Sequence, residues 1–234
     1  MRPGCTILIA GSRQGLGRAL AEHYVGRGHY VFGLSRRESD LVHPRYQHVC
    51  ADVTQEDSVQ EAFAKIQASA ASLEVLIFSA GLKTSNYALL TTKSQAADML
   101  HTNLLGPFLV TRHAVRQMKR NRFGRLIYLS SIAVPLGTVG SVMYGASKAG
   151  LEQMAFALSR EFPRDNITFN ALGISIYPSA MVEELGEKAL AETRAALVKA
   201  EMLQLDEVTG AIDFFASDAA RQITGQTLYF GGVR

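Results

Sequence analysis

The sequence predicts a single α/β domain with a doubly wound, seven-stranded parallel sheet and helices on both faces. Short apolar runs of strand length recur along the 234 residues, and several are apolar nearly throughout, as is typical of strands covered on both faces. Helical patterns separate these runs, so the strands are joined by crossovers and are expected to be parallel. Both observations favour a sheet that binds ligands at the carboxyl ends of its strands.

The predicted elements follow one another in a regular order. Strands are expected at Thr6–Ala10, Tyr30–Leu34, Tyr46–Cys50, Val75–Phe78, Arg125–Leu129, Ile167–Ala171 and Thr227–Phe230. Apolar residues at helical spacing indicate helices near Leu16, Val59 and Leu151, and we expect strands and helices to alternate throughout. Residues 1–234 are expected to form one domain, with residues 173–200 as a substrate lid because they have no clear place in the sheet.

Composition excludes several classes of protein. With 47% hydrophobic and 19% charged residues the chain is globular, and its 24 basic and 21 acidic residues form no basic run that would bind nucleic acid. The apolar runs are too short for a membrane span. Two cysteines, Cys5 and Cys50, are too few for a disulfide framework, so we expect a cytoplasmic protein. The histidines, such as His43 and His48, lack metal-ligand spacing, so no metal is expected.

A glycine-rich turn directly follows the first strand, and a helical pattern then runs to about Arg27. A turn without Cβ atoms lets backbone N–H groups approach a pyrophosphate, and the helix N-terminus adds partial positive charge. Because a strand precedes the turn and a helix follows it, the context predicts dinucleotide binding. The predicted binding residues are Gly11, Ser12, Arg13, Gln14, Gly15, Leu16 and Gly17.

The end of the second strand indicates which dinucleotide is bound. An acidic residue there would bind the 2′-hydroxyl of NAD, but the chain has Ser35, Arg36 and Arg37 and no carboxylate. A hydroxyl and two guanidinium groups suit a 2′-phosphate, although the two arginines also fit a solvated loop. NADP(H) is therefore favoured over NAD(H).

Tyr144 and Lys148 stand four residues apart in a predicted helix, so their side chains share one face. A phenol has a pKa of about 10 in isolation, and a nearby ammonium favours the phenolate. The pair alone also fits a helix surface. This spacing would let Tyr144 act as the acid in a reduction, and the residues considered next favour that role.

Taken together, these motifs resemble the short-chain dehydrogenase/reductase family, whose fold is the Rossmann fold, over nearly the whole chain. The resemblance rests on the G-x-x-x-G-x-G turn at 11–17, the Y-x-x-x-K motif at 144–148, Ile223 to Thr227 and Gly231-Gly232. It implies that Ser131, thirteen residues before Tyr144, is the catalytic serine in preference to Ser130. It also implies that Asn103 organises a proton relay with Lys148, and that Lys148 binds the ribose.

The resemblance implies further cofactor contacts. Asp52 and Val53 match the residues beside the adenine, and Ser79-Ala80-Gly81 matches the family's Asn-Ala-Gly. Tyr144 and Lys148 are also expected to contact the cofactor.

Four residues, at three places in the chain, depart from the family. Ala10 replaces a threonine before the turn, and Ser79 replaces the asparagine. Ile174-Ser175 replaces a Pro-Gly pair that lies along the nicotinamide, which leads us to expect an unusual path for the lid. Ser179 keeps the hydroxyl that contacts the carboxamide in the family.

These residues predict an NADP(H)-dependent oxidoreductase that reduces a ketone or 3-oxoacyl carbonyl, or catalyses the reverse oxidation, as in the 3-oxoacyl-acyl-carrier-protein reductase branch. The substrate is expected to be a small carbonyl or alcohol compound, free or tethered as a thioester. Its partly apolar pocket would contain Leu136, Val139, Met143, Tyr177 and Met181. The resemblance also implies a homodimer or homotetramer. Two alternatives remain open: a dinucleotide-binding sensor or partner subunit with little turnover, and an epimerase or dehydratase of the same family.

Overall fold

Seven parallel strands form one sheet in the computed structural model, which describes residues 1–69, 72–179, 182 and 186–233. The strand order is β3-β2-β1-β4-β5-β6-β7, so the chain reverses direction across the sheet between β1 and β4. The strands are β1 (Thr6–Ala10), β2 (Tyr30–Ser35), β3 (Tyr46–Cys50), β4 (Val75–Phe78), β5 (Gly124–Ser131), β6 (Ile167–Ile174) and β7 (Thr227–Tyr229). The predicted fold class is confirmed.

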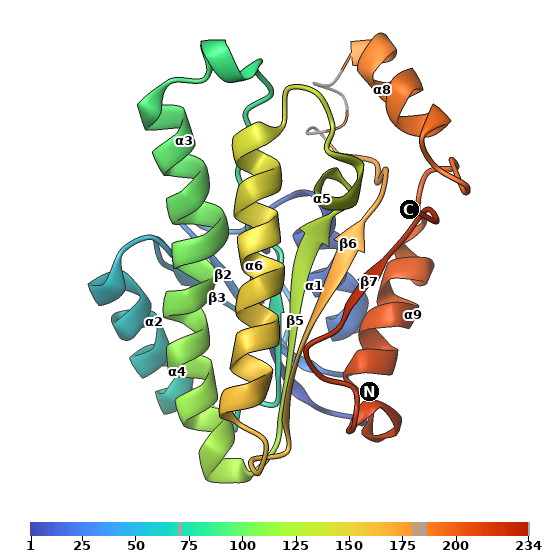
Figure 1. Ribbon diagram of the computed structural model, residues 1–234. Helices are drawn as coiled ribbons and strands as arrows, with labels where there is room; N and C mark the ends of the chain where they lie inside the picture. The colour runs from blue at the N-terminus through green and yellow to red at the C-terminus, as the bar shows by residue number, and fades with distance from the viewer. Residues whose placement is uncertain (70–71, 180–181, 183–185, 234) are drawn as a thin grey trace.

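Helices cover both faces of this sheet (Figure 1). They are α1 (Gly15–Gly26), α2 (Glu56–Ser69), α3 (Lys93–Leu100), α4 (Gly106–Asn121), α5 (Ala133–Leu136), α6 (Val142–Glu161), α8 (Gly186–Ala195) and α9 (Leu205–Phe215). Short 3-10 turns lie at Ala88–Leu90 and Asp218–Ala220, and a π-helical turn, His101–Leu105, joins α3 to α4. Among the described residues, no helix has the length and apolarity needed to cross a bilayer.

Alternating side chains of the central strands build two hydrophobic cores. Leu8 of β1 packs with residues of α2, α4 and α6, such as Val110 and Leu151. Its neighbours Ile7 and Ile9 point the other way and pack with α1 and α9. Because successive strand residues face opposite sides of a sheet, continuous apolar strands require helices on both faces.

β5 and β6 run further than their apolar patterns predict. Ser130 and Ser131 pair with Gly173 and Ile174, so the ladder continues through polar residues. Backbone pairing does not depend on apolar side chains, which explains the difference. The extension carries Ser131 to the carboxyl edge of the sheet.

The connection from β2 to β3 contradicts the expected alternation of strands and helices, because residues 36–45 form no helix. A Cβ atom on Gly33 of β2 would lie 2.0 Å from the Tyr46 hydroxyl oxygen. The Tyr46 side chain therefore lies over β2, on the face that α1 covers further along the sheet. A glycine in one strand thus makes room for an aromatic ring where the sequence predicts a crossover helix.

The expected lid at residues 173–200 begins inside β6 and includes α8 on the outside of the molecule, beyond the carboxyl ends of the strands (Figure 1). Ile176 and Leu197 are buried against Ile132, which follows β5. Met181, expected in the substrate pocket, lies outside the described residues.

Candidate active site and dinucleotide-binding turn

Two residues of the turn between β1 and α1 have to be glycine, Gly11 because the turn approaches the end of β4, and Gly17 because it lies against the backbone of the turn itself. A Cβ atom on Gly11, whose φ is +88°, would lie 2.5 Å from the backbone nitrogen of Ala80. A Cβ atom on Gly17 would lie 2.2 Å from the carbonyl oxygen of Gly11. At Gly15, whose φ is +57°, a Cβ atom would meet no atom of the described residues within 4 Å, which leaves open space above this part of the turn.

The N-terminus of α1 has features that favour the binding of an anion. Its N-cap residue, Gln14, makes no side-chain capping bond, and the first turn holds no acidic residue. The first N–H groups of a helix have no partner within the helix, so here they are available to a phosphate. Arg13 is exposed and donates to the Gln14 side chain over 3.2 Å, and Leu16 is half-buried. The turn therefore fits the pyrophosphate that the sequence predicts.

Arg36 and Arg37 follow β2 on the same edge of the sheet, and both side chains are exposed. Neither guanidinium takes part in an ion pair with the residues that the structure describes. Ser35 is half-buried, and its hydroxyl donates to the Arg37 carbonyl over 2.7 Å. The two cations are thus free to meet an anionic ligand.

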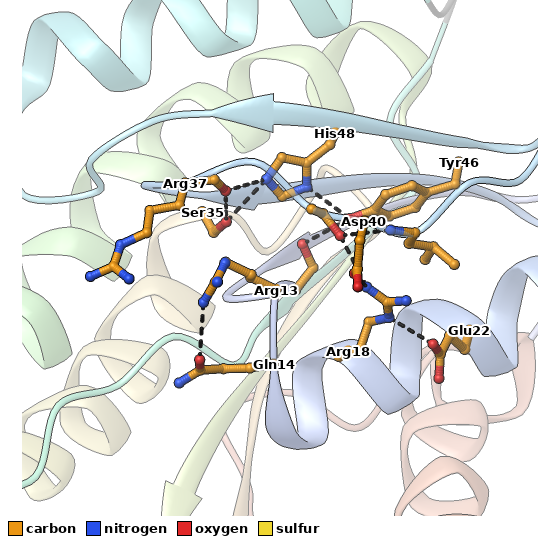
Figure 2. Close-up of polar contacts among 12 residues, drawn as sticks. Arg13, Gln14, Arg18, Glu22, Ser35, Arg37, Asp40, Tyr46 and His48 are labelled. Carbon is orange, nitrogen blue, oxygen red and sulfur yellow. Dashed lines mark hydrogen bonds and ion pairs between the residues drawn. The ribbon is translucent and has the colours of Figure 1, made fainter.

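A chain of hydrogen bonds connects this arginine segment to the glycine turn (Figure 2). His48 Nε2 lies 3.0 Å from both the Arg37 carbonyl and Ser35 Oγ, and His48 Nδ1 lies 2.8 Å from the Tyr46 hydroxyl. Tyr46 in turn lies 3.2 Å from Ser12 Oγ, and Ser12 is fully buried. Because a carbonyl only accepts, Nε2 carries the proton of neutral His48 and Nδ1 accepts from Tyr46.

Sequence reasoning gave Tyr46 and His48 no functional role. Two signals were present: they occupy alternate positions of one strand and so share a face, and Gly33 stands in the neighbouring strand. Burial lowers the pKa of His48, while its bond to the Arg37 carbonyl opposes this. His48 therefore supports the arginine segment as a neutral group near pH 7.

The same loop is held from α1. The Arg18 guanidinium donates to Ser39 over 3.2 Å and pairs with Asp40, and it also pairs with Glu22 over 2.7 Å (Figure 2). These contacts compensate for the missing crossover helix by tying the loop to the helix that begins at the glycine turn.

The other predicted cofactor residues have structural roles as well. Asp52 accepts from the Thr54 backbone N–H over 2.9 Å, which forms the turn before α2. Val53 is buried against Gly106, where a Cβ atom would lie 2.9 Å from the valine side chain. The Ser79 N–H donates to the Ala10 carbonyl over 2.9 Å, so the strand contact persists although serine replaces the family's asparagine.

Tyr144 and Lys148 lie one turn apart on α6, with 6% and 4% of their surfaces exposed. Lys148 Nζ donates to the Leu129 carbonyl over 2.8 Å and lies 5.9 Å from the centre of the Tyr144 ring. Burial lowers the pKa of Lys148 to about 8, and the negative charge of Glu152 opposes this. Burial raises the pKa of Tyr144, and the Ser131 hydroxyl opposes that.

Ser131 stands at the end of β5, next to Tyr144, and its Oγ accepts from the Ala133 N–H over 3.1 Å. Ser130 instead points to Glu152, with which it forms a hydrogen bond. Successive residues of a strand face opposite directions, so only one of the two serines can face Tyr144. The preference for Ser131 agrees with this geometry.

Asn103 lies on the π-helical turn between α3 and α4 and is fully buried. Its Oδ1 accepts from the Leu82 N–H over 2.7 Å, and its Nδ2 donates to the Leu82 carbonyl and to Ser147 Oγ over 2.8 and 2.9 Å. A Cβ atom on Gly81 would lie 3.5 Å from Lys148 Nζ and 3.6 Å from Asn103 Oδ1. Asn103 and Lys148 therefore face the same small space beside the end of β4.

Sequence reasoning also missed two residues around Tyr144. Ser147 is fully buried and links Asn103 to the Tyr144 carbonyl, to which it donates over 2.7 Å. Lys83 places its ammonium 5.5 Å from the centre of the Tyr144 ring, and burial lowers its pKa. Ser147 lies inside the Y-x-x-x-K motif, whereas nothing in the sequence pattern singles out Lys83.

The structure brings together only some of the residues predicted to form the substrate pocket and the lid. Met143 packs in the cluster that contains Tyr144, and Leu136 packs near Ile132, but Val139 is 75% exposed. Tyr177 packs against the core on the α1 side of the sheet. Ser179 Oγ donates to the Tyr177 carbonyl over 3.2 Å.

Ile174 and Ser175, which replace the family's Pro-Gly, lie where β6 ends, and the buried Ser175 Oγ has no hydrogen-bond partner among the residues that the structure describes. Within the described part of the chain, no group of three or more His, Cys, Asp or Glu side chains is arranged to hold a metal ion.

Residues 10–232 match a family model described as Enoyl-(Acyl carrier protein) reductase. The chain is 30% identical over 227 residues to the 3-oxoacyl-acyl-carrier-protein reductase MabA of Mycobacterium avium, covering 97% of this chain and 88% of the relative. It is 29% identical over 235 residues to the corresponding FabG of Salmonella typhimurium, covering 98% and 96%. Among solved structures, ElxO with NADP bound has a TM-score of 0.87 at 22% identity, with 97% and 96% covered, and shares the fold.

Proposed function

The chain belongs to the short-chain dehydrogenase/reductase family, and we propose that it reduces a ketone or 3-oxoacyl carbonyl to an alcohol with NADPH as the hydride donor. The observation that carries this proposal is the juxtaposition of Ser131, Tyr144 and Lys148 at the carboxyl edge of the sheet. Asn103 faces the same space, and the glycine turn lies beside the neighbouring strand end.

The residues of this chain fit NADP(H). The turn at 11–17 and the N-terminus of α1 would hold the pyrophosphate. The 2′-phosphate would be bound by Ser35, Arg36 and Arg37. Asp52, Val53 and Ser79-Ala80-Gly81 would line the adenosine and ribose sites. When bound, the reduced nicotinamide supplies the hydride.

Tyr144 gives its phenolic proton to the substrate oxygen, where negative charge develops. The Ser131 hydroxyl donates a hydrogen bond to the same oxygen, an electrostatic contribution often worth about 3 kcal/mol. The Lys148 ammonium stabilises the phenolate that Tyr144 leaves behind. Asn103 fixes the backbone around Leu82 and, with Lys148, borders the space through which the proton is replaced.

Two hydroxyl groups that converge on one point suit a carbonyl oxygen, which supports carbonyl reduction over reduction of a carbon–carbon double bond. The names of MabA and FabG favour a 3-oxoacyl group on a thioester carrier. We propose that residues 173–200 close over this substrate, that Ser179 contacts the cofactor, and that the protein works in the cytoplasm as a homodimer or homotetramer.

The test is NADPH oxidation with ketones, 3-oxoacyl thioesters, enoyl thioesters and quinones. We expect turnover with the 3-oxoacyl thioesters, and a loss of about 100-fold or more in kcat for Tyr144→Phe, since general acid catalysis typically contributes that much. Tyr87→Phe is the control, because Tyr87 is 67% exposed. NADPH binding without turnover would favour the sensor, and turnover with enoyl thioesters alone would overturn carbonyl reduction. Product release without net cofactor oxidation would indicate an epimerase or dehydratase.

The pH profile follows from Lys148, whose pKa is about 8. Below that pH Lys148 is an ammonium, and above it the group is neutral and no longer stabilises the phenolate. We therefore expect kcat/KM for reduction to fall as pH rises through about 8, since kcat/KM reports groups of the free enzyme. An alkaline limb that Lys148→Met leaves unchanged would contradict this assignment.

A further inference from the structure

Glu152 lies one turn beyond Lys148 on α6 and binds two strands at once. Its Oε1 accepts from Ser130 Oγ of β5, and its Oε2 accepts from the Tyr229 hydroxyl of β7 over 2.5 Å. These strands are not neighbours, because β6 lies between them (Figure 1). Glu152 therefore spans three strands of the sheet from the helix that carries Tyr144 and Lys148.

The sheet is built to allow this contact. Ser130 pairs with Gly173, and Gly173 pairs with Tyr229, so the three residues form one row across β5, β6 and β7. A Cβ atom on Gly173 would lie 2.0 Å from the Tyr229 ring. The central residue of the row has to be glycine, because the ring lies over it to reach Glu152.

Glu152 and Lys148 hold adjacent residues of β5. Lys148 Nζ donates to the carbonyl of Leu129, and Glu152 binds the side chain of Ser130, the next residue. Ser131 follows directly. The end of β5 is thus fixed at two consecutive residues by two side chains from one face of α6.

Glu152 differs in charge from the other described groups around Lys148. Tyr144 lies on the same helix, Lys83 approaches the Tyr144 ring from the segment after β4, and Asn103, from the turn before α4, is neutral. Among the described residues, Glu152 is the acidic group whose charge favours the ammonium form of Lys148. An opposite charge nearby matters most where burial has removed water.

We propose that Glu152 is a positioning residue, which holds the end of β5 in place for Ser131 and supplies the negative charge that keeps Lys148 an ammonium. This inference deepens the proposed function and rests on it for its catalytic meaning. The effect of the Glu152 carboxylate on the Lys148 ammonium does not depend on a bound cofactor, so it can be measured in the cofactor-free protein.

The first test is therefore made without cofactor or substrate. The ε-CH₂ signal of Lys148 in ¹³C-labelled protein, assigned by its loss in Lys148→Arg, is followed by NMR as pH is raised. In Glu152→Gln, which keeps the shape of the side chain and removes its charge, we expect the midpoint to fall by roughly one pH unit. Glu161→Gln, an exposed glutamate at the end of the same helix, should leave it unchanged. A midpoint that Glu152→Gln does not move would overturn the proposal.

The second test uses turnover of the NADPH-dependent reaction. We expect the alkaline limb of kcat/KM to move to lower pH in Glu152→Gln, with a larger change in kcat than in KM. Tyr229→Phe keeps the carboxylate and removes one of its two bonds, so its alkaline limb should not move to lower pH. A purely structural brace would instead lower activity equally at every pH, in both variants.

If Glu152→Gln does not fold, the double variant Ser130→Ala/Tyr229→Phe still decides the question. It removes both hydroxyl donors, which offset part of the carboxylate charge, and leaves the charge itself, so Lys148 should titrate at a higher pH than in the unaltered protein. An unchanged or lower midpoint would overturn the proposal. If no substrate of the panel is turned over, the proposed function fails, while the NMR titration still reports on Glu152.

Discussion

The proposed catalytic end and the proposed adenosine end of the site are built in different ways. At the catalytic end, Asn103, Tyr144 and Lys148 are almost completely buried, and Asn103 and Lys148 donate hydrogen bonds to backbone carbonyls. At the adenosine end, Arg36 and Arg37 are exposed on a loop that is held through its backbone by His48. The catalytic side chains are therefore held by burial and by hydrogen bonds of their own, whereas the exposed arginine side chains are positioned through the backbone of their loop. We expect substitutions to be correspondingly severe at the first end and graded at the second.

The largest effect is expected for Asn103→Ala. The change removes three hydrogen bonds and leaves the Leu82 backbone groups without their partners. We expect the free energy of unfolding to fall by about 2–3 kcal/mol, measured by urea denaturation, together with a large loss of kcat. Asn121→Ala is the control, because Asn121 is exposed at the end of α4. Equal stability of the two variants would show that the catalytic end is less tightly fixed than its contacts indicate.

A smaller effect, on selectivity rather than stability, is expected for Arg36→Asp. Removing a guanidinium and adding a carboxylate should lower the preference for NADPH over NADH by roughly 10- to 100-fold, since charge-assisted bonds to phosphate are lost. The loss should shrink as salt is added, because exposed charges are screened. Arg164→Asp, at another exposed arginine, should leave the preference unchanged. An unaltered NADPH to NADH ratio in Arg36→Asp would remove Arg36 from the 2′-phosphate site.

Tyr46→Phe tests the hydrogen-bond chain behind the arginine segment. Without the hydroxyl, His48 loses its Nδ1 partner and Ser12 loses its link to the loop. We expect NADPH affinity, measured by calorimetry, to weaken by roughly threefold to tenfold, the cost of one or two neutral hydrogen bonds. Tyr87→Phe again serves as the control. NADPH affinity equal to that of the control would mean that the arginines need no support from β3.

The smallest effect is expected for Ser179→Ala. Its hydroxyl donates to a carbonyl of its own loop, so the side chain is available to a ligand only after that bond is exchanged. We expect NADPH binding to weaken by roughly twofold to fivefold, about one hydrogen bond. An unchanged dissociation constant would exclude Ser179 from the cofactor site.

The difference between the two ends also governs what the sequence reveals. Helical spacing placed Tyr144 and Lys148 on one face, because a helix repeats its geometry at known intervals, whereas Ser131 was predicted from the family resemblance by its separation from Tyr144. The loop after β2 has no such repeat, so its missing helix was not predicted. Glu152, Tyr46 and His48 escaped notice because each acts on a different element, and contacts across elements are set by the packing of the whole domain.

Gly33 nevertheless left a trace in the sequence, because it stands inside the predicted strand Tyr30–Leu34, whereas Gly173 lies beyond the predicted end of its strand at Ala171. Each is a glycine inside a strand, where this residue is unfavourable unless another group needs the space. The structure supplies that group in both cases, Tyr46 over Gly33 and Tyr229 over Gly173. A glycine within a predicted strand is therefore a reason to look for a large side chain on the adjacent strand.

The row Ser130–Gly173–Tyr229 restricts the order in which substitutions can occur during evolution. An alanine at position 173 would overlap the Tyr229 ring, so it is tolerated only after that ring has been replaced by a smaller side chain. In the reverse direction, a tyrosine at 229 is accessible only from an ancestor that already had glycine at 173. The two positions form an ordered pair, and their substitutions should be strongly epistatic rather than additive.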